Sequence, residues 1–192
     1  AAVRRHEASQ YNRLTPEMID ERLQSELDMT ERFFAGWPIE PPLGLREQCL
    51  ARRYVSIACM DYIIGRYDVG RERMERAIAL DGTLARAGNA HIAREFGWAV
   101  RRHVEVTRGR VSDVAATFDC AMANWPPALR PMPRCLQRWL VEEIFGSLGW
   151  SLARHGAWRD ARQSLMRVVR VDPSLACNRG FWSICFRAAV AR

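Results

Sequence analysis

Apolar residues recur every three or four positions along most of the chain, and polar residues fill the positions between them. This spacing is typical of amphipathic α-helices. Fragments rich in β-branched residues, at 104–106 and 168–171, lie inside the helical periodicity and have no hairpin turn beside them. The pattern therefore predicts an all-α protein.

The first helical run extends from Thr15 to Phe34. Thr15 suits an N-cap because its hydroxyl can accept a backbone N–H, and Pro16 follows where its missing N–H is not needed. Glu17 places a negative charge in the first turn, where the helix dipole favours it. The apolar stripe of this predicted helix consists of Met18, Ile19, Leu23, Leu27 and Phe34.

One segment of the chain is repeated. Residues 54–81 align without a gap on residues 145–172, with Gly65 on Gly156 and Met74 on Leu165. A third, weaker copy lies between them and aligns Gly109 with Gly156, although its first half lacks the small residue that the other two copies share. Self-similarity of this kind indicates a copied supersecondary unit.

Each copy has the pattern of a helix, a tight turn at glycine and a second helix. The glycine can adopt the left-handed conformation that ends a helix. Gly70 and Ala161, a few residues later, are small enough for the second helix to approach the first closely. We expect antiparallel helical hairpins that stack as a solenoid.

The last copy resembles a tetratricopeptide (TPR) repeat. The matching positions are Phe145, Leu148, Gly149, Leu152, Ala161, Leu165, Val168 and Pro173. In the first copy Asp61 stands where Leu152 stands in the last, and the glycine spacings, 65 to 109 and 109 to 156, exceed the roughly 34-residue TPR period. The resemblance therefore implies a TPR-like solenoid.

Proline-rich stretches at 37–42 and 125–133 divide the chain into parts. Residues 1–36 are expected to form an N-terminal tail and amphipathic helix, and residues 45–192 a TPR-like domain. Its repeat units span about 45–82, 88–126 and 134–173, and a capping helix spans 174–191, with Phe181, Ile184, Cys185 and Ala188 on its inner side.

Composition limits the possible function classes. No apolar run approaches the roughly 20 residues of a membrane span, and no apolar leader follows Arg4 and Arg5, so we expect a cytoplasmic protein for which peripheral membrane contact stays open. The net charge is +7, and all 29 basic residues are arginine. Because acidic residues alternate with them, solvated helix faces explain most of these arginines, and a nucleic-acid or anion binder is an alternative.

Motifs for chemistry are missing from the sequence. There is no phosphate-binding glycine loop, no nucleophile elbow, no C-x-x-C and no H-E-x-x-H, so we expect no catalytic residue, metal or cofactor. Cys59 and Cys120 lie in apolar runs and are predicted to be buried thiols. We therefore expect a scaffold that binds a protein partner through the groove lined by the first helices of the hairpins. The candidate contact residues are Arg52, Arg53, Trp98, Arg101, Arg102 and Trp125.

A second resemblance concerns the two ends of the chain. The stretch 3–12 followed by the helix from Thr15, together with the phrase 155–165 and Asp172-Pro173, is similar to the C-terminal tail of bacterial family-2 glycosyltransferases. The resemblance implies that Arg5 and His6 lie near a diphosphate in a full-length enzyme. The D-x-D motif and nucleotide-sugar-binding sheet of that family are not in these residues, so the alternative function is a fragment that orients a catalytic domain. The oligomeric state stays open.

Overall fold

The structure, a computed structural model, describes residues 14–86, 90–107, 111–130 and 132–190, and within this part every regular element is helical. The α-helices are α1 (Pro16–Ala35), α2 (Leu45–Ile63), α3 (Tyr67–Leu80), α4 (Ala90–Thr107), α5 (Val111–Ala123), α6 (Arg134–Val141), α7 (Ser147–Arg154), α8 (Trp158–Val171) and α9 (Arg179–Val190). A π-helical segment, Glu142–Gly146, joins α6 to α7, and short 3₁₀ turns follow α3, α5 and α8.

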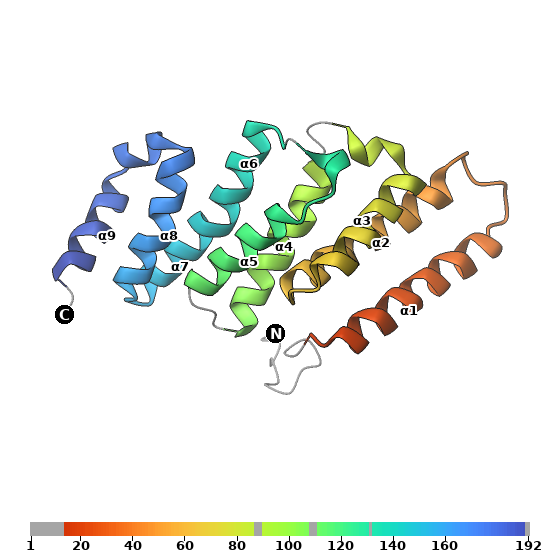
Figure 1. Ribbon diagram of the computed structural model, residues 1–192, viewed down its shortest axis with the longest axis horizontal. Helices are drawn as coiled ribbons and strands as arrows, with labels where there is room; N and C mark the ends of the chain where they lie inside the picture. Colours follow the sequence, from red (N-terminus) through yellow and green to blue (C-terminus); the bar gives the residue numbers. More distant parts are fainter. Residues whose placement is uncertain (1–13, 87–89, 108–110, 131, 191–192) are drawn as a thin grey trace.

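The helices form one row with α1 and α9 at its two ends (Figure 1). Helix α2 packs on α1, α3 and α4, and α4 packs in turn on α6 and the π segment. At the far end α8 lies between α7 and α9. Helices α2 and α3 lie within the predicted unit 45–82, and α4 and α5 lie within 88–126.

The sequence signals at the helix ends are confirmed. The Thr15 hydroxyl accepts the Met18 backbone N–H at 3.3 Å, and Pro16 begins α1. Gly65 and Gly156 adopt φ angles of +85° and +78°, so each ends its helix in the left-handed region that favours glycine. The third predicted turn, at Gly109, lies outside the described residues.

The main core fills the space between α2, α4, α5 and the π segment. At its centre the rings of Tyr62, Phe96 and Trp125 pack against one another, with Tyr62 and Phe96 each 5.3 Å from Trp125 between ring centroids. A smaller core joins α7, α8 and α9 around Leu165, Phe181 and Ile184. The inner side of α9 is therefore apolar, as its sequence pattern predicts.

The predicted burial of cysteine is right for one residue and wrong for another. Cys59 is fully buried in the main core. Cys120 is exposed, because the core side of α5 is formed by Val114, Phe118 and Ala121, and Cys120 lies on the opposite side of that helix. Cys135 and Cys177 are exposed as well, so Cys59 is the one cysteine of the described residues that is buried.

Glycines allow two helix pairs to approach closely. A Cβ atom added at Gly70 of α3 would lie 3.2 Å from the Ala58 carbonyl oxygen of α2. A Cβ atom at Gly149 of α7 would lie only 2.6 Å from Cγ of Leu165, which is fully buried in α8. The interface between α7 and α8 therefore has no room for a side chain at position 149.

We expect Gly149→Ala to destabilise the protein by about 1–3 kcal/mol, because the added methyl group forces Leu165 or the backbone to move. Gly82→Ala is the matched control, since a Cβ atom at Gly82 meets nothing within 4 Å. The free energy of unfolding in urea checks both variants. Equal stability of the two would show that α7 and α8 can separate at no cost.

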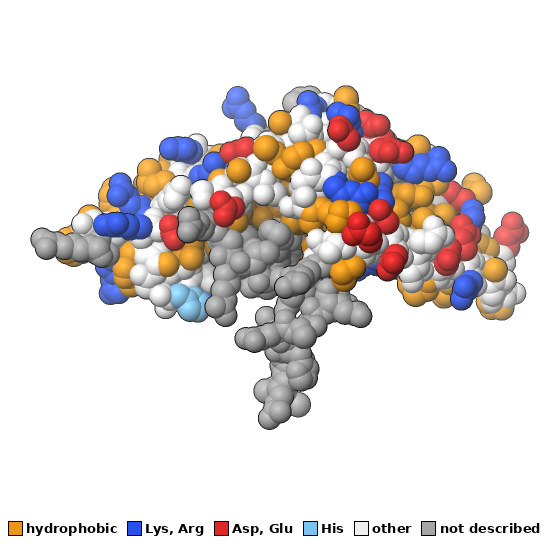
Figure 2. Space-filling view, turned by 60° about the horizontal axis from the view of Figure 1, so that its bottom comes forward, with side chains coloured by type: hydrophobic (Ala, Val, Ile, Leu, Met, Phe, Trp, Pro, Cys, Tyr) orange, Lys and Arg blue, Asp and Glu red, His pale blue; other side chains and the backbone are white. Residues whose placement is uncertain are grey.

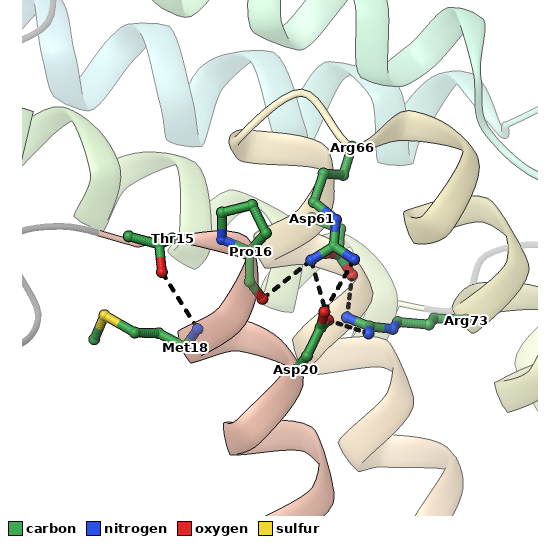
Figure 3. Close-up of polar contacts among 7 residues, drawn as sticks. All are labelled: Thr15, Pro16, Met18, Asp20, Asp61, Arg66 and Arg73. Carbon is green, nitrogen blue, oxygen red and sulfur yellow. Dashed lines mark hydrogen bonds and ion pairs between the residues drawn. The ribbon is translucent and has the colours of Figure 1, made fainter.

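A buried carboxylate fixes α1 to the next two helices (Figure 3). Asp61 of α2 is fully buried, and its Oδ2 accepts a hydrogen bond from Arg73 Nη1 of α3 at 2.7 Å. Arg73 Nη2 also donates to Asp20 of α1 at 2.5 Å, and Arg66 donates to Asp20 and to the Pro16 carbonyl oxygen at 3.0 and 3.1 Å. We call Asp20, Asp61, Arg66 and Arg73 the α1 clamp.

The two carboxylates of the clamp have opposite pKa shifts. Burial raises the pKa of Asp61 more than the nearby Arg73 and Arg66 lower it. Hydrogen bonds from Arg66 and Arg73 lower the pKa of Asp20, which is largely solvent-exposed. Asp20 therefore adds stability above its ordinary pKa of 3.8, and this stability is lost as the pH falls through its lowered pKa in the folded protein.

Removal of one arginine from the clamp should be costly. We expect Arg73→Met to lower the free energy of unfolding by on the order of 3 kcal/mol, because it leaves the Asp61 carboxylate buried without its hydrogen-bonded partner. Arg71→Met, which breaks only the exposed ion pair with Asp68, should cost less than about 1 kcal/mol. Chemical denaturation of both variants at neutral pH measures the difference, and equal losses would mean that the clamp is no stronger than a surface pair.

Candidate partner-binding surfaces

One exposed stripe runs along α4. Arg94, Trp98 and Arg101 follow one another at spacings of four and three residues, so they lie on the same side of the helix, and all three are exposed. Trp98 has 39% of its surface in solvent. An indole ring between two guanidinium groups is the kind of surface at which Trp and Arg contribute strongly to protein binding.

The two predicted contact arginines of α2 diverge. Arg53 turns toward α1 and lies 3.8 Å from the carboxylate of Glu26. Arg52 lies on the side of α4, close enough to add to the electrostatic field that lowers the pKa of His91, a shift caused mainly by burial of the imidazole. Arg52 therefore extends the α4 stripe, and we call Arg52, Arg94, Trp98 and Arg101 the stripe surface.

Glu142 and Glu143 of the π segment form ion pairs on different sides of that segment. Glu143 accepts a hydrogen bond from Arg101 at 3.0 Å and so links the stripe surface to the π segment. Glu142 instead pairs with Arg138 at 2.7 Å on the other side. The two carboxylates therefore pair with arginines of different helices.

Trp125 does not lie on any partner surface, and the prediction that it is a contact residue is wrong. It is only 3% exposed, because its ring fills the space between Tyr62 and Phe96 in the main core. The Tyr62 hydroxyl donates to the neighbouring Asn124 carbonyl oxygen at 3.1 Å, which holds this link against α2. The Arg102 side chain, Arg5 and His6 lie outside the described residues.

A cleft of about 430 Å³ opens between α6–α7 and the end of α8. Its walls combine apolar and polar groups from α6, the π segment, α7, α8 and the turn that follows. They are Arg138, Glu142, Gly146, Ser147, Trp150, Val168, Asp172, Ser174, Leu175 and Asn178. Arg138 spans the cleft, because it donates to Asp172 at 2.5 Å as well as to Glu142.

The electrostatics of the cleft are set by these pairs. Hydrogen bonds from Ser174 and the charge of Arg138 lower the pKa of Asp172, so this carboxylate is ionised at neutral pH. The cleft wall contains two acidic residues, Glu142 and Asp172, and one basic residue, Arg138. The cleft therefore has a slight negative charge beside the ring of Trp150.

The π segment forms part of the cleft wall through Glu142 and Gly146. The buried hydroxyl of Ser164 in α8 donates to the Phe145 carbonyl oxygen of the π segment at 2.8 Å. π-Helical turns occur frequently at functional sites. The sequence analysis does not predict this cleft. The one sequence signal near it is Ser164, a polar residue at a core position of the apolar pattern of α8.

Charge is distributed unevenly over the molecule. In Figure 2 acidic side chains gather toward the α1–α3 end, whereas arginines are spread over both ends of the molecule. Most arginines with described ion pairs connect different helices, as Arg167 of α8 does with Asp119 of α5 at 2.9 Å. Within the described part of the chain, no group of three or more His, Cys, Asp or Glu residues is placed to hold a metal ion.

Comparison with known proteins finds no relative: no protein-family profile matches the chain, and no curated protein or solved structure shows significant similarity. None of the described helices is both long and apolar enough to cross a membrane.

Proposed function

We propose that this chain is a non-catalytic scaffold, a TPR-like solenoid of antiparallel hairpins, that binds a protein partner or supports a catalytic one. The stripe surface is the observation that carries the proposal. Three helices that begin the predicted units, α2, α4 and α6, pack in succession, and Arg52, Arg94, Trp98 and Arg101 are exposed on the first two. A repeat array of this kind offers a continuous surface and needs no catalytic group.

The chemistry of the stripe surface favours an acidic partner segment. The stripe surface combines three exposed arginines with one exposed indole. Among the ion pairs of the described residues, Arg101 is the one stripe arginine with a carboxylate partner, Glu143 of the π segment. A segment with Asp or Glu residues on either side of an apolar residue would pair with the arginines and cover Trp98. Arginine forks bind carboxylates in a bidentate geometry, which adds specificity.

The test is affinity capture from a lysate of the source organism at low and at high salt. Three baits are compared: the unchanged chain, the double variant Arg94→Glu and Trp98→Ala, and Arg162→Glu, an exposed control on α8. We expect a defined protein to bind the unchanged chain and the control and to fall at least about tenfold on the double variant, as is typical of interface hot spots.

Two outcomes contradict this proposal. Identical protein recovery on all three baits would mean that the stripe surface is not the contact. Recovery of nucleic acid or another anionic polymer alone, and only at low salt, would favour the anion-binding alternative, because counterion release makes such binding steeply salt-dependent.

A second candidate function is the C-terminal helical tail of a family-2 glycosyltransferase. The observation that favours it is the α1 clamp, because a domain joined in front of Thr15 would have its orientation fixed through α1 against α2 and α3. The coding sequence upstream is the test. An in-frame α/β domain with a D-x-D motif would support this role, and a stop codon shortly before Ala1 would contradict it.

A further inference from the structure

We propose that copies of this chain associate head to tail, with the outer face of α9 of one copy docked on the exposed side of α1 of the next. These two helices lie at opposite ends of the row (Figure 1). Each has one side packed on its neighbour and the other side in solvent. The proposal is independent of the stripe surface, which lies on α2 and α4.

The outer face of α9 is apolar. Trp182, Phe186 and Val190 follow one another at four-residue spacing and have 59%, 72% and 61% of their surfaces in solvent. They lie opposite the buried residues of the same helix, among them Phe181 and Ile184. The row from Trp182 to Val190 on α9 is about 12 Å long, at a rise of 1.5 Å per residue. Contiguous apolar surface of this kind marks an interaction site more often than single exposed residues do.

The C-terminal end of α1 carries a matching apolar patch. Met29, Phe33 and Trp37 have the same four-residue spacing, and Met29 and Phe33 are 56% and 58% exposed. The rings of Phe33 and Trp37 pack edge to face with centroids 4.7 Å apart, so the patch is already ordered. Ile39 and Leu43, in the link from α1 to α2, are exposed as well.

The charges of α1 and α9 are opposite in sign. Helix α1 contains six acidic residues and two arginines, and residues 173–190 contain two arginines, Arg179 and Arg187, and no acid. Arginines of α2 and α3 reach the inner acids of α1, and Glu17, Glu21 and Asp28 are left on its exposed side.

Only a head-to-tail contact brings opposite charges together. Pairing α9 with α9 of another copy would bring two basic helices together, and pairing α1 with α1 would bring two acidic ones together. Figure 2 shows the same polarity, with acidic side chains toward the α1 end of the molecule. A contact between different faces leaves one face open on each terminal copy, so it grows into a ring or a filament.

The experiment is sedimentation velocity of the full chain over a concentration series, with two variants that each add a charge to one patch. Phe33→Glu alters the apolar patch of α1, and Phe186→Glu alters the apolar outer face of α9. Met166→Glu, at an exposed apolar position of α8, is the control. All three positions are exposed, and thermal unfolding confirms that each variant is folded.

We expect the unchanged chain and the control to associate reversibly with rising concentration, and less so at high salt, while each patch variant alone stays monomeric. An equimolar mixture of the two patch variants should form dimers and nothing larger, because each dimer uses the intact α9 of one variant and the intact α1 of the other. This complementation distinguishes a head-to-tail contact from a symmetric one.

Three outcomes would overturn the proposal. The first is an unchanged chain that stays monomeric at every concentration. The second is Phe33→Glu that still dimerises alone, which would indicate a symmetric α9 contact. The third is a mixture of the two variants that shows no dimer. None of these results bears on the capture experiment with the stripe surface, so the two proposals fail separately.

Discussion

The burial of one carboxylate constrains the first three helices. Asp61 lies on the inner side of α2, where a charge is stable only if it is paired and hydrogen-bonded. Arg73 from α3 and Arg66 from the turn supply that pairing, and the same two arginines then hold Asp20 of α1. Since the arginines pair with two carboxylates, the position of α1 is coupled to the packing of α3 on α2.

Close packing has the equivalent role at the other end of the row. Gly149 lets α7 lie against Leu165 of α8, and the hydroxyl of Ser164 binds the carbonyl oxygen of Phe145 one layer away. Together they hold α7 close to α8, while Arg138 spans the gap between α6 and Asp172. Arg138 and Asp172 both line the cleft, so their ion pair is part of its wall.

Local signals were sufficient to predict the helices, and contacts distant in sequence determined the rest. Periodicity, the Thr15 cap and the glycines at 65 and 156 predict where helices begin and end because these effects act within one turn. The burial of Trp125 depends on its contacts with Tyr62 and Phe96, which are distant from it in the sequence. The α1 clamp had a sequence signal, an aspartate at position 61 within an apolar run, but only the structure supplies its partners.

The candidate surfaces could be predicted in part for the same reason. Trp98 and Arg101 share a helix face that the sequence alone defines, whereas the separation of Arg52 from Arg53 depends on the acidic side of α1. In each ion pair between the described helices the cation is an arginine. A guanidinium stays charged throughout the alkaline range that proteins encounter. The bridges to Asp20 and Asp172 are therefore lost only when these carboxylates are protonated. Because the pKa of each is lowered in the folded protein, that loss is confined to acid conditions.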